Sequence, residues 1–189
     1  SEKYALNSLS STNIITEKNN NELLSKNLNL SVFGGAQFST GDAGQEIWKY
    51  LEGTKQEANK INKIFLDNKI STKEYAGLLA SEENLKSLDG KNSPGILHIA
   101  THGFFYPDPK EVKQIEEAQS EIGDVAFRGG SSGLGLEMLV KNTNPLMRSG
   151  LALAMANDVW TKTTTDGEDG VLTAYEVSNM NLQNTQLLV

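Results

Sequence analysis

The sequence of 189 residues contains no cysteine and only two histidines. The missing cysteines exclude a disulfide framework, thiolate metal sites and, within these residues, a cysteine nucleophile. A basic excess is also lacking, because 17 lysines and arginines stand against 24 acidic residues and the net charge is −7. Since nucleic acids are bound through clustered positive charge, this balance argues against a direct nucleic-acid partner.

Long apolar runs are absent as well. No stretch approaches the about 18 apolar residues that a membrane-spanning helix needs, and no basic-then-apolar leader opens the sequence. We therefore expect a protein without a membrane partner, located in the cytoplasm. The apolar fraction of 38% is sufficient for a globular domain with its own core.

From residue 29 onward, short apolar runs alternate with amphipathic segments. Strands are predicted at 30–38, where the pair Gly34-Gly35 favours a bulge, at 72–77 and at 96–100. Helices are predicted between them, because Thr54 and Glu57 have capping-box spacing and Ser81 precedes two glutamates. This alternation with short connections predicts an α/β fold with a mainly parallel sheet.

The remaining segments divide the chain further. Residues 1–28 are polar and predict a linker or preceding segment, and residues 106–148 predict an insertion within the domain 29–189. A strand is predicted at 150–156, a short helix at 173–180 and a final strand from 186. The sequence begins without methionine and stops inside an apolar run, so both ends are expected to be cuts in a longer protein.

The two histidines, His98 and His102, lie in the segment LHIATHGF. Their spacing would suit a zinc ion on a helix, but Pro94-Gly95 before them and Gly103 after them favour a strand. On a strand the two side chains would lie roughly 13 Å apart and could not share an ion. His98 is therefore predicted to be a core histidine. His102 follows the end of an apolar strand, where α/β sheets build their sites, and is the candidate for proton transfer.

Two further motifs have plainer explanations. GGSSG at 129–133 matches the nucleophile elbow of serine hydrolases around Ser131, but both histidines precede it and the order of that triad fails. Residues 165–176 resemble a calcium-binding loop with Glu176 at its last position, but two ligands are missing. A Gly/Ser loop and a turn before a capped helix explain these segments, so no metal or other cofactor is predicted.

Five stretches, in order, resemble the CHAT domain, a bacterial relative of caspases and separases that is often fused to tetratricopeptide repeats. They are 51–64 (LEGTKQEANKINKI), 95–105 (GILHIATHGFF), 144–154 (NPLMRSGLALA), 169–176 (DGVLTAYE) and 182–189 (LQNTQLLV). The segment HIATHGFF is the most specific of them. The resemblance implies a caspase-like αβα sandwich, here truncated at its C-terminal side.

The resemblance also implies a Cys–His peptidase site. His102 falls on the family's catalytic histidine, and Gly103 falls on the glycine whose amide helps to hold the oxyanion. The family's final strand continues into Leu-Ser-Ala-Cys, whose cysteine is the nucleophile, and this sequence is expected to stop a few residues before it. Asp158 is a candidate for the substrate pocket that selects the residue cleaved after; the plainer interpretation is an exposed loop acid or turn former.

Two hypotheses follow from these implications. The first is a cysteine endopeptidase that acts on a protein or peptide substrate, that is inactive as this fragment alone, and that a repeat domain or partner protein controls. The second is a pseudo-peptidase or scaffold that uses the same sheet for protein binding, with the insertion 106–148 facing its partner. A serine hydrolase built on Ser131 is a third option.

Overall fold

A computed structural model of the chain describes residues 28–41, 46–108, 141–161 and 168–189. All but the last residue of the predicted linker 1–28 lies outside these ranges, as does most of the predicted insertion with Ser131. The first residues of the calcium-loop-like segment also lie outside them. No helix in the described ranges is long and apolar enough to cross a bilayer.

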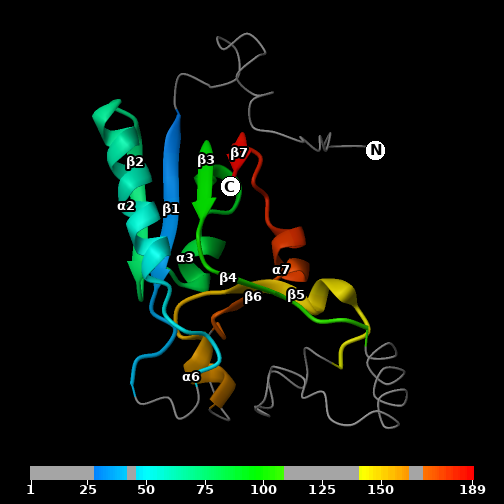
Figure 1. Cartoon of the computed structure of the whole chain (residues 1–189). Helices are drawn as coiled ribbons and strands as arrows, with labels where there is room; N and C mark the ends of the chain where they lie inside the picture. Colours follow the sequence, from blue (N-terminus) through cyan, green and yellow to red (C-terminus); the bar gives the residue numbers. More distant parts are fainter. Residues whose placement is uncertain (1–27, 42–45, 109–140, 162–167) are drawn as a thin grey trace, which may run out of the picture.

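Four strands form a parallel sheet in the order β2-β1-β3-β7 (Figure 1). They are β1 (Asn29–Ala36), β2 (Ser71–Gly77), β3 (Ile96–Ile99) and β7 (Leu187–Leu188). The connections carry α2 (Glu52–Asp67) between β1 and β2, and α3 (Glu82–Lys86) between β2 and β3. This confirms the predicted α/β class with a mainly parallel sheet.

Helices cover both faces of this sheet, because β1 carries apolar side chains on each face. On one face, Leu30 and Val32 share a buried cluster with Ala58 of α2. On the other, Phe33 shares a second cluster with Leu85 of α3. The sheet is therefore the middle layer of an αβα arrangement, with a core on each side.

The glycine pair in β1 forms the predicted bulge. The register between β1 and β2 shifts between Phe33 and Ala36, and Gly35 has a φ of +63°, which glycine adopts without strain. A Cβ at Gly34 would lie 2.5 Å from the carbonyl oxygen of Thr54. The first turns of α2 therefore rest directly on the backbone of β1.

The capping box predicted at the start of α2 is wrong. The helix begins at Glu52, and Thr54 lies inside it. The Thr54 hydroxyl donates to the carbonyl oxygen of Leu51 (2.7 Å) and accepts the N–H of Gly35 (2.9 Å), so it joins the helix to the bulge. The cap predicted at Ser81 is confirmed, since its side chain accepts a backbone N–H in the first turn of α3.

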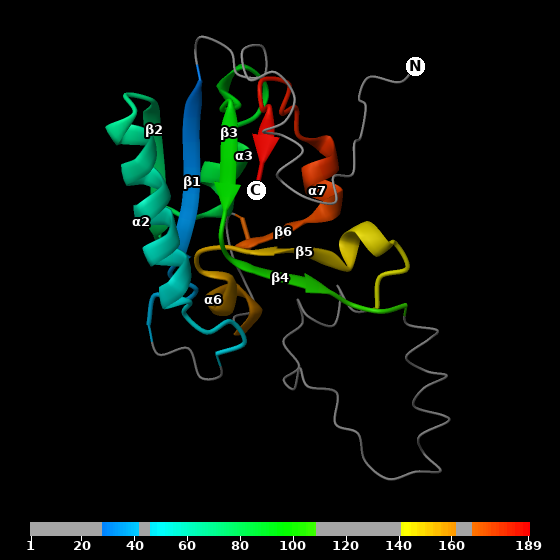
Figure 2. The ribbon, with the colours of Figure 1, turned by 45° about the horizontal axis from the view of Figure 1, so that its top comes forward.

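A second, antiparallel sheet lies across the carboxyl ends of the parallel strands (Figures 1 and 2). Its strands are β4 (His102–Phe105), β5 (Ser149–Ala152) and β6 (Val171–Thr173), in the order β4-β5-β6. The strand predicted at 150–156 is shorter than expected, because the chain turns at Met155 (φ 68°) into α6 (Ala156–Thr161). Strands β4 and β6 were not predicted, since segments of three or four residues show no clear periodicity.

The helix predicted at 173–180 is present as α7 (Ala174–Asn179). Thr173 and Glu176 form a capping box, in which the Thr173 hydroxyl accepts the Glu176 N–H and the Glu176 carboxylate accepts the Thr173 N–H. The final strand predicted from residue 186 is also present, as β7.

The two ends of the predicted insertion lie side by side. The N–H of Tyr106 donates to the carbonyl oxygen of Arg148 (2.8 Å), and Nη1 of Arg148 donates to the carbonyl oxygen of Tyr106 (2.7 Å). The chain therefore leaves the second sheet and returns to it at one place, as an insertion would. The boundaries 106–148 stay a prediction.

Candidate active site

His102 lies where the two sheets meet. It is the third residue after Ile99, the last residue of the central strand β3, and it is the first residue of β4. Its imidazole is half-buried, with the rings of Phe38 and Trp48 centred 5.2 and 5.4 Å away. A titratable side chain is thus positioned at the carboxyl end of the parallel sheet, the edge at which α/β proteins build their sites.

The backbone fixes which nitrogen of His102 carries the proton. Nε2 lies 2.7 Å from the carbonyl oxygen of Lys49. Because a carbonyl oxygen can only accept, Nε2 must donate, and in the neutral ring Nδ1 is then the nitrogen with the free lone pair. Nδ1 is therefore the atom of His102 that can take a proton from a nucleophile.

The amide of Gly103 points away from the rest of the second sheet. In an antiparallel ladder, residues alternate between turning their N–H and C=O toward a partner strand and away from it. The Tyr106 N–H bonds to Arg148, so the alternation gives Gly103, paired with Leu151, the outward orientation. On the other side of β5, the Leu153 N–H bonds to Gly170, which agrees with this alternation. In the described part of the chain β4 is an edge strand, so the Gly103 N–H faces the open side.

His98 takes a different place from His102. It belongs to β3, is 7% exposed, and its Nε2 lies 3.2 Å from Oε1 of Glu57 on α2. The predicted core position is therefore observed. The two histidines lie on different strands, and neither belongs to the group of metal-ligand side chains found among the described residues.

Asp158 anchors the loop that follows β1. Its carboxylate accepts hydrogen bonds from the Ser39 hydroxyl (2.6 Å), the Thr40 N–H (2.8 Å) and the Thr40 hydroxyl (2.6 Å). The residue is 8% exposed, so it is a buried acid rather than the exposed loop acid weighed against the substrate-pocket hypothesis. Its assignment to a substrate pocket stays a prediction.

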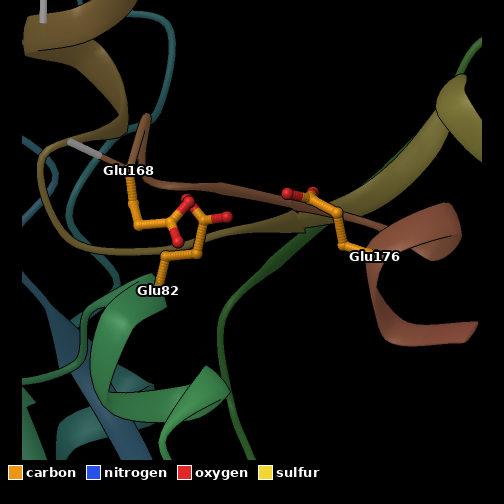
Figure 3. Close-up of side chains that lie close together, drawn as sticks. All are labelled: Glu82, Glu168 and Glu176. Carbon is orange, nitrogen blue, oxygen red and sulfur yellow. The ribbon is translucent and has the colours of Figure 1, made fainter. Parts of the chain in front are cut away.

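Three glutamates lie close together beside the second sheet (Figure 3), and all three contact one lysine. Nζ of Lys86 lies 2.7 Å from Glu82 of α3, 2.7 Å from Glu168 and 2.9 Å from Glu176 of α7. Glu82 also accepts the N–H of Gly170 (3.0 Å), just before β6. Carboxylate oxygens this close, within 4.8 Å of one another, would suit a cation, and the Lys86 ammonium takes that place. We call these four side chains the Lys86 cluster; it ties α3 to β6 and α7.

The Lys86 cluster gives the fold a pH dependence. Burial raises the pKa of Glu82 to about 8, although the hydrogen bond from Lys86 opposes this. The folded state then holds a proton that the unfolded chain releases above a pKa of about 4.5, so stability falls as pH rises from about 4.5 to about 8. Glu82→Gln should remove a slope of up to about 1.4 kcal/mol per pH unit. Urea unfolding at several pH values measures it.

The neighbours of Glu82 define the control for this prediction. Burial raises the pKa of Asp169 as well, which acts in the same direction. Burial acts to raise the pKa of Glu176, but the hydrogen bonds from Lys86 and Thr173 together lower it, so the stability that Glu176 contributes is lost only as the pH falls below the ordinary pKa of a glutamate. Glu168→Gln changes a far more exposed carboxylate and should keep the slope between pH 5 and 8. An unchanged slope in Glu82→Gln would contradict the assignment.

Several features of this edge were not predicted from the sequence. The Lys49 carbonyl, which orients His102, is a backbone atom and leaves no trace in the residue type. Trp48 and Asn157 lie beside it, and neither residue belongs to a sequence motif that indicates a site. The Lys86 cluster shares Glu168 and Glu176 with the calcium-loop-like segment, and its other two members, Glu82 and Lys86, come from α3.

The fold and this edge define an α/β, caspase-like domain. The family model of the CHAT domain matches residues 1–189, and the chain therefore belongs to the CHAT domain family. Domains of this family are typically caspase-like and related to peptidases. No curated protein and no solved structure matches the chain significantly.

Proposed function

We propose that this CHAT domain supplies the histidine half of a cysteine endopeptidase site. In this proposal Nδ1 of His102 accepts the proton of a thiol, and the N–H of Gly103 donates to the oxyanion that forms when the thiolate attacks a peptide carbonyl. The 189 residues contain no cysteine, so the sulfur comes from outside them. The substrate is a protein or peptide.

The observation that carries this proposal is the register of β7 on β3. The two strands are parallel, with Ile96 opposite Leu187 and Leu97 opposite Leu188, and the Ile99 N–H bonds to Val189. A chain that continues in this register runs toward His102 and reaches its level about four residues after Val189. The CHAT resemblance expects the nucleophilic cysteine at that place.

The order of events follows from the geometry of His102. Its Nε2 stays bonded to the Lys49 carbonyl, so the imidazolium that forms on thiol deprotonation keeps its orientation. The same ring can then return a proton from Nδ1 to the leaving amine, as a general acid. Water then attacks the acyl enzyme while Nδ1 of His102 accepts a proton from it, and the thiolate leaves.

Gly103 provides the sharpest test of the oxyanion role. The activity tests need a protein that contains this chain together with the segment that bears the nucleophilic cysteine. We call it the cysteine-bearing protein. Gly103→Pro removes the N–H but breaks no ladder bond, because that N–H faces outward from an edge strand. We expect kcat for a peptide substrate to fall roughly 10²- to 10³-fold, as when one oxyanion donor is lost. Steady-state kinetics measures this.

Gly103→Ala is the matched control. A Cβ at this position would meet nothing closer than 3.8 Å, and the N–H is retained, so stability and most of the activity should survive. Equal activity of the proline and alanine variants would remove Gly103 from the oxyanion site. Circular dichroism must show that both variants fold, because only then does the comparison report on the N–H.

A scaffold that binds protein without cleaving it is the second candidate. The observation in its favour is a shallow apolar hollow on the second sheet, where Phe105 is 69% exposed. Gly103, Leu151, Leu172 and Val177 also line it. A peptide electrophile that labels thiols separates the two candidates. Labelling of the cysteine-bearing protein, lost in His102→Ala, supports the peptidase, and no labelling supports the scaffold.

A further inference from the structure

Asn157 connects α6 to the walls around His102. It is 1% exposed, and its side-chain oxygen accepts the N–H groups of Ile47 (3.1 Å) and Trp48 (2.9 Å). Its side-chain nitrogen donates to the carbonyl oxygen of Trp48 (2.8 Å). The amide thus bonds both to the N–H and to the C=O of one residue, which fixes the plane and direction of that backbone segment.

The segment held by Asn157 is the one that orients His102. Lys49 follows Trp48 directly, and its carbonyl oxygen accepts the proton on Nε2 of His102. The ring of Trp48 also packs against the imidazole. Because two consecutive peptide planes share one α-carbon, a rotation at Trp48 would turn the Lys49 carbonyl away from Nε2.

The backbone of Asn157 holds a second neighbour of His102. Its N–H donates to the carbonyl oxygen of Phe38 (2.9 Å), and the ring of Phe38 lies 5.2 Å from the imidazole of His102. One residue therefore fixes both aromatic neighbours of His102 and the segment that leads to its hydrogen-bond acceptor. The neighbouring Asp158 anchors a different stretch, at Ser39 and Thr40.

We propose that Asn157 is a positioning residue for His102, which selects the Nε2–H tautomer by holding the Lys49 carbonyl in place. It contacts neither substrate nor nucleophile and acts through the 47–49 backbone. This inference rests on the proposed function only for its catalytic consequence, since the tautomer of His102 can be measured in the absence of any reaction.

The test measures the tautomer of His102 by NMR, which is straightforward because the chain has only two histidines. With ¹⁵N-labelled imidazoles, NMR gives one spin system for His98 and one for His102, assigned by replacing each in turn. In the native chain His102 should be a single Nε2–H tautomer whose ring proton remains visible at neutral pH. In Asn157→Ala both tautomers should be populated and the ring proton should exchange too fast to see, with His98 unchanged.

Asn29→Ala is a control of matched chemistry. Asn29 is the first residue of β1, whereas Phe38 follows its last residue, and the Asn29 side-chain oxygen accepts the N–H of Gly95 (2.8 Å). Its loss should leave His102 as in the native chain. If Asn157→Ala does not fold, Asn157→Asp keeps the oxygen that accepts from Ile47 and Trp48 but sets a second acceptor oxygen against the Trp48 carbonyl, so it should also populate both tautomers of His102.

A second measurement needs no variant at Asn157. As urea is raised below the unfolding transition, the slow exchange of the Ile47 and Trp48 amides and the single tautomer of His102 should be lost together. A folded Asn157 variant with the native His102 spectrum would overturn the proposal. So would loss of Trp48 protection while His102 keeps one tautomer.

Activity measurements separate the positioning role of Asn157 from the proposed peptidase function. In the cysteine-bearing protein, Asn157→Ala should lower kcat roughly 10²-fold with KM nearly unchanged. A changed tautomer in a protein that never cleaves peptides would leave the positioning role intact and remove the peptidase. A native tautomer of His102 in an Asn157 variant that has lost activity would remove the positioning role and leave the peptidase function intact.

Discussion

Replacing His102 with alanine should abolish peptide cleavage by the cysteine-bearing protein, with kcat/KM falling roughly 10³-fold or more. The thiol would lose its proton acceptor and the leaving amine its proton donor. Stability should change by about 1 kcal/mol or less, because the imidazole is half-buried and its one hydrogen bond within the described residues goes to the Lys49 carbonyl. Steady-state kinetics and urea unfolding measure the two effects.

His98→Ala is the control for this prediction. His98 is 7% exposed within β3, so its removal should cost about 1–3 kcal/mol while turnover of the folded protein is retained. The opposite outcome, full stability with lost turnover in His98→Ala and retained turnover in His102→Ala, would exchange the roles of the two histidines.

Replacing Lys86 with methionine should cause the largest loss of stability. The substitution keeps most of the side-chain length but leaves three carboxylates close together, one of them, Glu82, only 1% exposed. Removing one partner of a buried ion pair costs about 3–5 kcal/mol, and we expect about 2–4 kcal/mol because Lys86 is itself 27% exposed. Urea unfolding at pH 9, above the raised pKa of Glu82, measures the loss.

The pH dependence of this loss identifies its cause. At pH 5.5 the buried Glu82 can bind a proton in the folded state, since burial raises its pKa, and the repulsion among the carboxylates is then smaller. The cost of Lys86→Met should therefore be lower at pH 5.5 than at pH 9, where Glu82 of the native chain is mostly ionised. A loss of equal size at both pH values would indicate lost packing of the lysine stem instead of lost charge.

The sequence predicted the parallel sheet well, because its strands carry strong signals. The apolar run 96–100 lies in the middle of the sheet, and the glycine pair in β1 marks a place where a helix touches the backbone. These features depend on local periodicity and on residue size, which the sequence records directly. The helices at 173–180 and after Ser81 were also predicted from a local signal, in their case the capping residues.

The second sheet and the orientation of His102 were not predicted, because both depend on contacts between distant segments. Strands β4 and β6 become strands only by pairing with β5. Thr54 and Glu57 have the spacing of a capping box, but tertiary contact with Gly35 uses Thr54 differently. Likewise, the position of His102 at the strand end was predicted, whereas the acceptor of its proton is a backbone carbonyl about 50 residues away in sequence.

The pairing of His102 with a thiol is tested most directly by the pH dependence of cysteine alkylation. In the native cysteine-bearing protein, His102 should stabilise the thiolate, so the rate of reaction with iodoacetamide should rise with a midpoint well below the about 8.5 of a free thiol. In His102→Ala the midpoint should return to about 8.5. The same midpoint in both proteins would contradict the account, because His102 would then not interact with the sulfur.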